Sequence, residues 1–406
     1  MRLSLPPRLG ASRPRTLLIG ALLALCGLVV GAVIHGETGT GGFWVGVGLA
    51  ALPLPVVALA VRWLGPVAPA AWRAALFAFG WGACVATLVA LTVNGLLVRW
   101  LTAEPARLAP SQPDTLELTV IAPMVEETAK AGALLVVWLG GAARGHRVLV
   151  ALAVAGCAAA GFAFTENVLY LGSAFEQDQR LGSWSLSQSA TAVTFVVRMV
   201  VAPFAHPLFS ALTGLGFGLA MALGPARERA RRNGHRWRVA LPLAGLALAM
   251  VLHSVWNAAT SLSFFRFAAV YLLTLPLLGV VCWLAVSLRR RELRMIRRTL
   301  THYVAAGWLA PGEPAALGSP GDRARARRAA RHARGAAGAR ALADYQRTAT
   351  ELARLRNEAT LGRDTGDFPG REHRLLERLW QDREFASATT LATAEPPPTG
   401  TVARPD

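Results

Sequence analysis

The chain has 406 residues, of which 53% are hydrophobic and only 16% are charged, and its formal net charge is +18. A mean hydropathy of +0.40 excludes an ordinary soluble domain and a disordered chain. The positive charge alone suggests an anionic partner, but the arginines gather at the N-terminal tip, in short loops and in the C-terminal third. This distribution is typical of membrane topology, and no nucleic-acid partner is expected.

Apolar stretches long enough to cross a bilayer recur along the first 290 residues, since a spanning helix needs about 20 apolar residues. We expect eight spans, at residues 17–35, 43–61, 74–97, 118–139, 148–172, 192–222, 239–261 and 267–287. The sequence therefore predicts an all-α polytopic membrane protein, with an N-terminal segment at 1–16 and a transmembrane helical domain at 17–287.

Every second loop between these spans is basic. The arginines of these loops are Arg2, Arg8, Arg13, Arg15, then Arg62 and Arg73, then Arg144 and Arg147, then six between Arg227 and Arg238, then Arg289 to Arg291. The alternate loops carry Glu37, then Glu104, Asp114 and Glu117, then Glu176 and Asp178, with Arg266 as the exception. By the positive-inside rule, both termini are expected in the cytoplasm and the number of spans is even.

Beyond residue 288 the composition becomes rich in Arg and Ala. Apolar residues at 342–352 repeat at three-and-four spacing, so residues 288–385 are expected to form a largely helical cytoplasmic tail. A triple proline predicts a disordered C-terminus at 386–406. The arginine run at 323–334 can bind nucleic acid or anionic lipid, but without interleaved aromatics a solvated helical face is the preferred interpretation.

Ionisable side chains inside hydrocarbon are costly, so each one within a predicted span is a candidate for a functional site. They are Glu126, Glu127 and Lys130 in the fourth span, Glu166 in the fifth, Arg198 and His206 in the sixth, and His253 in the seventh. At a rise of about 1.5 Å per residue, Glu126, Glu166, His206 and His253 fall in one layer of the outer half of the bilayer. Four helices thus offer polar groups at one depth, as a buried site requires.

The residue types at this depth are typical of a metal site. Two imidazoles and a carboxylate are a common ligand set for a catalytic zinc, which keeps one position for a water whose pKa falls to about 7. We expect Glu166, His206 and His253 to supply this set. A second carboxylate must take the proton of that water, and Glu126 or Glu127 is available. Because neighbours on a helix point about 100° apart, at most one of the two faces the metal.

Three further polar residues are expected to assist. Lys130 lies one turn after Glu126 and can partly neutralise the carboxylates. Asn257 lies one turn after His253, where its amide can orient a ligand or donate to an oxyanion. Arg198 is expected to be a salt-bridge partner, with a role at the oxyanion as the alternative.

Prolines predict a local break in the sixth span. Pro203 and Pro207 flank His206, and a residue that precedes proline is pushed away from the helical region. Pro123 is expected to disturb the helix in the same way shortly before Glu126.

At these residues the chain resembles the PrsW family of intramembrane metalloproteases, which are related to the CAAX prenyl-protein endopeptidases. The matching motifs stand in order on successive spans: E-E-x-x-K at 126–130, F-x-x-x-E-N at 162–167, HPLFSALTGLGFGLA from residue 206, and H-S-V-W-N at 253–257. The resemblance covers residues 117–261, and the order and helix placement of the motifs make it specific. The segment YVAAGWL at 303–309 is similar to tails of actinobacterial members.

The resemblance implies a zinc-dependent endopeptidase in a bacterial cell membrane, acting on membrane-anchored proteins in the outer half of the bilayer. One member of the family cleaves membrane-anchored anti-sigma factors, so a regulator of that type is expected. The resemblance also favours Glu126 over Glu127 as the proton acceptor, and it places Glu166 where the CAAX relatives have a histidine.

Two other classes of function stay open from the sequence. In an ion-coupled or proton-coupled transporter, the same buried Glu and His side chains would form a relay, although no inverted repeat is visible. A non-catalytic membrane scaffold would act through its basic tail, although the intact set of four motifs counts against it.

Overall fold

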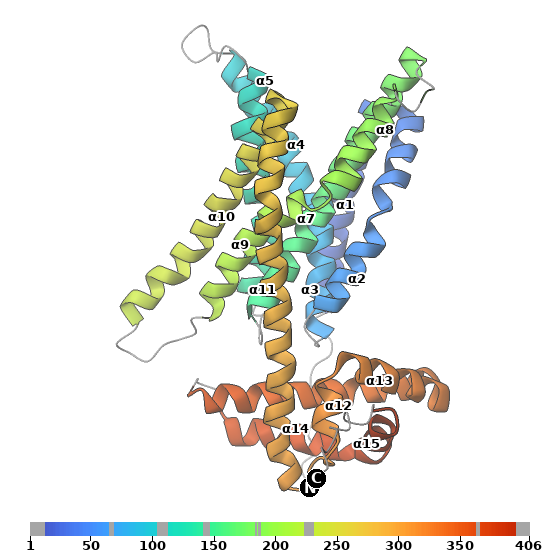
Figure 1. The fold of residues 1–406 in the computed structure, drawn as a ribbon, viewed down its shortest axis with the longest axis vertical. Coiled ribbons are helices and arrows are strands. Elements are labelled where there is room, and N and C mark those ends of the chain that lie inside the picture. Colours follow the sequence, from blue (N-terminus) through green and yellow to red (C-terminus); the bar gives the residue numbers. More distant parts are fainter. Residues whose placement is uncertain are drawn as a thin grey trace, which may run out of the picture. The chain divides into compact units, whose positions relative to one another are not determined.

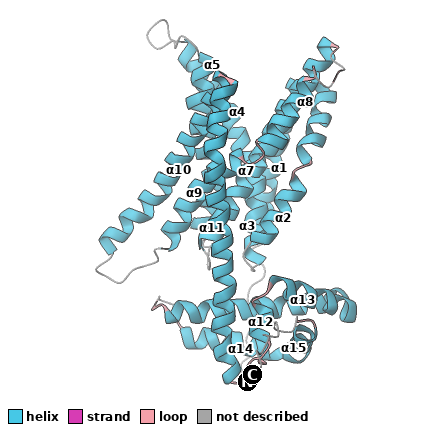
Figure 2. Cartoon of the chain, in the orientation of Figure 1, coloured by secondary structure: helices cyan, strands magenta, loops and turns pink. Residues whose placement is uncertain are grey.

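The computed structural model describes residues 13–64, 69–103, 113–140, 147–182, 185, 188–222, 231–362 and 366–394, and within these ranges it is helical, with no strand (Figures 1 and 2). It divides into two compact units. The membrane unit comprises Met1–Gly65 and Ala70–Ala285, and the C-terminal unit comprises Pro66–Pro69 and Val286–Asp406. Several predicted features lie outside the described residues: most of the 1–16 segment, and the loop charges Arg2, Arg8, Glu104, Arg144, Arg227 and Arg229.

The N-terminal part of the membrane unit consists of α1 (Arg13–Ala51), α2 (Leu54–Leu64), α3 (Pro69–Gly80), the π-helix η1 (Trp81–Ala86) and α4 (Thr87–Ala103). Helix α1 is interrupted at Gly39, whose φ of 65° is a conformation that other residues rarely adopt. After this kink, α1 packs closely against α7 (Arg147–Leu181). A Cβ atom at Gly46 would lie 2.4 Å from the carbonyl oxygen of Val168, so this approach requires glycine.

The remaining helices of the membrane unit carry the polar residues. They are α5 (Pro113–Leu116), π-helix η2 (Glu117–Ile121), α6 (Ala122–Leu139), α7, α8 (Ala190–Phe195), π-helix η3 (Val196–Val201), α9 (Ala205–Ala222), α10 (Arg231–Leu262) and α11 (Phe264–Ala305). The predicted break before His206 is confirmed, because η3 ends at Val201, Ala202 is non-helical (φ −121°, ψ 33°) and α9 begins at Ala205.

Small residues bring α7 close to α3 and η1. A Cβ atom at Gly82 would lie 1.9 Å from the carbonyl oxygen of Ala158, and one at Gly161 would lie 2.0 Å from that of Phe79. Alanines of α3, α6 and α7 form much of the adjoining core. The close backbone approach fixes α7 against its neighbours, and thereby fixes the helix that carries Glu166.

Six described helical stretches are long and apolar enough to cross a membrane: Thr16–Trp63, Trp72–Leu97, Val148–Leu181, Ala190–Ala222, Arg236–Thr260 and Phe265–Ala305. Large apolar side chains such as Leu28 (72% exposed) and Leu273 (75% exposed) cover the outside of the unit, as expected of a surface that faces lipid. The chain is therefore a multi-pass membrane protein.

The predicted number of eight spans is not confirmed. The first two predicted spans lie in the one stretch Thr16–Trp63. The predicted span 118–139 is not among the six, because Glu126, Glu127 and Lys130 make it too polar. The other five predicted spans each correspond to one stretch.

The C-terminal unit has a core of its own, formed by the end of α11 with α12 (Glu313–Leu317), α13 (Pro320–Thr360), α14 (Phe368–Gln381) and α15 (Arg383–Ala392). Leu342, Tyr345, Ala349 and Leu352 are all buried, which confirms the amphipathic helix predicted there. The Tyr345 hydroxyl donates to Glu313 Oε1 at 2.7 Å. Burial, followed by the charge of this carboxylate, raises the pKa of Tyr345.

Two expectations for this part of the chain need correction. Helix α15 continues to Ala392 where disorder was expected from residue 386, because Ala386 packs into the core; residues 395–406 lie outside the described part. The arginine run is not wholly a solvated face either. Arg323 is buried, and its guanidinium donates to Thr350 Oγ1 and to the carbonyl oxygens of Leu317 and Gln346.

Candidate active site

A cavity of about 790 Å³ lies within the membrane unit. Its lining includes the carboxylates of Glu126 and Glu166 and the imidazoles of His206 and His253, whereas Glu127 does not line it. Helices α6, α7, α9 and α10 contribute one of these four residues each. The four helices that the sequence analysis expected to offer polar groups at one depth thus each contribute a residue to this cavity.

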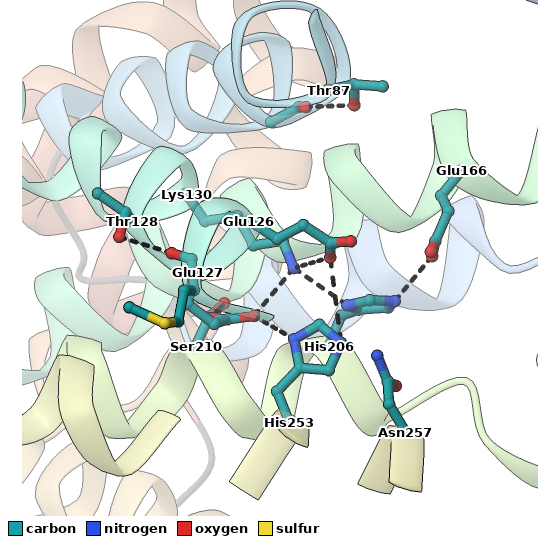
Figure 3. Close-up of polar contacts among 12 residues, drawn as sticks. Thr87, Glu126, Glu127, Thr128, Lys130, Glu166, His206, Ser210, His253 and Asn257 are labelled. Atoms are coloured by element: carbon teal, nitrogen blue, oxygen red, sulfur yellow. Dashed lines mark hydrogen bonds and ion pairs between the residues drawn. The ribbon is translucent and has the colours of Figure 1, made fainter. Parts of the chain in front are cut away.

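The E-E-x-x-K motif of α6 forms a buried ion-pair cluster (Figure 3). Lys130 Nζ lies 3.2 Å from Glu126 Oε2 and 2.9 Å from Glu127 Oε1, and all three side chains are at most 9% exposed. The ammonium group also lies 4.0 Å from the centre of the Phe162 ring, a favourable cation–π distance. Lys130 thus forms ion pairs with both carboxylates, the arrangement that the predicted neutralisation requires.

His206 lies between α6 and α7, with one ring nitrogen toward each (Figure 3). Its Nδ1 is 3.1 Å from Lys130 Nζ, and its Nε2 is 2.8 Å from Glu166 Oε2. A carboxylate accepts hydrogen bonds, so Glu166 favours the tautomer that carries the proton on Nε2 and leaves a lone pair on Nδ1.

His253 is held in a similar way by the other glutamate of the α6 pair. Its Nδ1 lies 3.2 Å from Glu127 Oε1, and its Nε2 faces Glu126 Oε2 at 4.0 Å. The second oxygen of Glu127 accepts a 2.9 Å hydrogen bond from the Ser210 hydroxyl, and the Phe209 ring stacks on His253 at a centroid distance of 4.8 Å. These contacts fix the imidazole plane and direct Nε2 toward Glu126.

Glu126, His206 and His253 each offer one ligand atom, and these atoms all lie within 4.8 Å of one another. This set differs from the predicted one, in which Glu166 was the third ligand. Glu166 is engaged elsewhere, since its Oε2 pairs with the Arg198 guanidinium as well as with His206. The structure thus places Glu126 in the position that the sequence analysis gave to Glu166.

Arg198 and Asn257 both line the cavity but are engaged with the protein. Arg198 is a salt-bridge partner, as expected: besides its pairing with Glu166, its Nε donates to Asn167 Oδ1 at 2.6 Å. Its guanidinium also covers the Tyr170 ring at 3.9 Å. The Asn257 amide donates to the carbonyl oxygen of Leu118 in η2 at 2.9 Å, so in this structure it anchors the π-helix that precedes α6.

Sequence reasoning missed three contributors to the site. Ser210 stands four residues after His206, and this spacing, which places both on one face of α9, could have revealed it. Asn167 is the neighbour of Glu166 in the sequence, but the sequence analysis gave it no role beyond its place in the family motif. Trp81 donates from Nε1 to the carbonyl oxygen of Ala129 at 2.9 Å, a link from η1 to α6 that no local pattern predicts.

The charges of the site fit a bound cation. Three carboxylates, Glu126, Glu127 and Glu166, contact two cationic side chains, Lys130 and Arg198, so with neutral imidazoles the cluster carries one net negative charge. An uncompensated charge in an apolar interior is costly, and a bound cation would offset this negative charge. The donor set of two imidazoles and a carboxylate is one that zinc accepts.

A model of the PrsW family of intramembrane metalloproteases matches residues 70–289, just over half of the chain. The chain belongs to this family. It is therefore a peptidase, and the three groups that could hold a metal lie within the matched residues. No curated protein matches the chain, and no solved structure matches it.

Proposed function

We propose that this PrsW-family member is a zinc endopeptidase whose metal is held by Glu126, His206 and His253. The observation that carries the proposal is the convergence of these three groups within 4.8 Å, in a largely buried position that also lines the cavity. A zinc ion bound there would polarise a substrate carbonyl and lower the pKa of its water.

In this proposal, two carboxylates orient the imidazoles. Glu166 accepts from His206 Nε2 and Glu127 accepts from His253 Nδ1, so the lone pair of each histidine lies on its opposite ring nitrogen. On His206 this nitrogen, Nδ1, lies 3.1 Å from Lys130 Nζ, so a bound metal would take the place of that contact. Pairing of a ligating histidine with a carboxylate is common in metal sites and raises the basicity of the ligand. The role of Lys130 is to balance the charge of Glu126 and Glu127.

Glu166 is also our candidate for the acceptor of the proton of the attacking water. Glu127 does not line the cavity, and Glu126 belongs to the proposed donor set, so Glu166 is the remaining carboxylate of the cluster that lines the cavity. Arg198 supplies the positive charge that a buried carboxylate needs to stay ionised, the form that accepts a proton. The proton would pass from Glu166 to the leaving amine.

The cavity favours an apolar peptide segment as substrate. Apart from the polar cluster, alanine, leucine, valine and phenylalanine side chains dominate its lining. We infer a membrane-anchored protein, with an anti-sigma-factor type of regulator as one candidate. Cleavage in the outer half of the bilayer follows if the arginine-rich loops lie in the cytoplasm.

The test of this function is cleavage of a single-span substrate by the purified full-length chain in detergent. A chelator should stop cleavage, added zinc should restore it, and His253→Ala should abolish it. Cleavage that survives both the chelator and His253→Ala would contradict the proposal.

A further inference from the structure

The C-terminal unit contains a second cavity, of about 560 Å³, between α11 and the start of α13. Arg290, Arg291, Arg294 and Arg297 of α11 line it, and its lining includes no acidic residue. All four arginines are exposed, and within the described ranges no carboxylate forms an ion pair with any of them. The neighbouring Arg289, in contrast, is paired with Glu292 at 3.0 Å. The cavity is therefore lined by cationic groups that lack a protein counter-ion.

The turn between α12 and α13 holds one of these arginines in place. A Cβ atom at Gly318 would lie 1.9 Å from Arg297 Cγ and 2.7 Å from Arg297 Cδ, so the aliphatic part of Arg297 crosses the turn where only glycine leaves room. Ser319 then caps α13, its hydroxyl accepting from the Asp322 amide at 3.3 Å. One wall of the cavity thus consists of arginines of α11. The opposite wall is the N-terminal end of the long helix α13, and the partial positive charge at a helix N-terminus also favours anions.

The position of these arginines in the sequence of α11 indicates which kind of anion they would bind. The candidate span Phe265–Ala305 has 41 residues, about twice the roughly 20 that a bilayer requires, so its arginine-rich half extends beyond the hydrocarbon. Trp283 is 66% exposed, as is typical of a residue at the membrane interface. Arg290 follows it by only seven residues in the sequence, so the arginines come directly after the apolar part of the span.

We propose that this arginine-lined cavity binds the phosphate headgroup of an anionic phospholipid in the leaflet where α11 leaves the membrane. Guanidinium groups bind phosphate in bidentate geometry, and basic pockets beside membrane-spanning helices are suited to such headgroups. The residues that line this cavity all belong to the C-terminal unit, and the proposal is independent of the proposed peptidase chemistry.

The experiment is a lipid titration of the full-length chain in detergent, followed by native mass spectrometry. Phosphatidylglycerol should bind in preference to phosphatidylcholine. The triple variant Arg290→Gln, Arg294→Gln, Arg297→Gln should weaken phosphatidylglycerol binding by about tenfold or more, since each basic residue contributes measurably to binding an anionic surface. Arg290→Gln alone, at an exposed position that folding does not require, should weaken it by about fivefold. Phosphatidylcholine binding should not change.

The matched control removes the same charge from elsewhere in the unit. Arg328, Arg331 and Arg340 are exposed residues of α13 outside the cavity, and their triple replacement by glutamine should leave phosphatidylglycerol binding unchanged. An equal loss in both triple variants would mean attraction by net charge and would overturn the proposal. Displacement of the lipid by millimolar inorganic phosphate, or tighter binding of an oligonucleotide at the same arginines, would also overturn it.

Discussion

Replacing Glu126 with glutamine should empty the metal site, whereas the same replacement at Glu166 should leave the metal bound and stop turnover. Glu126 belongs to the group of three converging ligand atoms, while Glu166 reaches that group only through its 2.8 Å contact with His206. An amide is a poor substitute for an anionic ligand. At position 166, in contrast, the glutamine amide can still accept the hydrogen bond of His206, but it cannot accept a proton.

These contacts set the expected magnitudes. Losing an orienting partner of a ligand typically costs about 10–100-fold in metal affinity, so Glu166→Gln should regain full occupancy at high zinc. Its turnover should nevertheless fall by about 10²–10⁴-fold, the usual contribution of a general base. Glu126→Gln should lose more metal affinity than the roughly 10–100-fold of an orienting residue.

The assay measures metal content by mass spectrometry across a zinc titration, before cleavage of a single-span substrate is measured on the same samples. Glu176→Gln is the matched control, because it makes the same change on α7 outside the cavity and its oxygen can still accept from the Gly42 amide. A thermal melt of each variant checks the fold, since Glu166→Gln leaves Arg198 without its carboxylate partner.

The opposite pattern would refute the reasoning. If Glu126→Gln kept its zinc and lost turnover while Glu166→Gln lost zinc, then Glu166 would be the ligand and Glu126 the proton acceptor. The contact of Glu166 with Arg198 would then have to break when the metal binds.

Three more outcomes are expected. Ser210→Ala should weaken zinc binding several-fold, because Glu127 loses its 2.9 Å hydrogen-bond donor. Thr213→Val on the same helix is the control and should have no effect, because the buried Thr213 hydroxyl has no hydrogen-bond partner among the described residues. Equal zinc affinities of the two variants in a titration would contradict this prediction. Tyr345→Phe leaves Glu313 Oε1 without its donor and should destabilise the C-terminal unit by about 1–3 kcal/mol, seen as faster amide exchange of α12 and α13 in the full chain; unchanged protection would argue against it. Reporter fusions after residues 144 and 232 should lie in the cytoplasm, and fusions near 114 and 178 outside; a cytoplasmic signal at 178 would overturn the proposed topology.

The sequence was sufficient to predict the helical membrane fold and the ionisable residues that the structure brings together, because charges in apolar helices are rare and stand out. It also predicted the helix break before His206, since proline acts on its own backbone. The number of spans was harder to predict, because the functional charges of 118–139 lower the hydropathy of that helix.

The sequence alone does not determine the contacts that each side chain of the site makes. Depth along a helix places Glu126 and Glu166 at one level, but the direction of each side chain depends on its partners on other helices. Arg198 engages Glu166 from η3, and Ser210 fixes Glu127 from α9. Such contacts between residues 32 and 83 positions apart leave no local pattern in the sequence.

The most direct test of the account is the metal content of the purified full-length chain compared with His206→Ala and His253→Ala. We predict about one zinc ion per wild-type chain and a loss of metal in both variants, because a site with three protein ligands holds its ion weakly once one is removed. Full metal occupancy in both variants would contradict the proposed metal site.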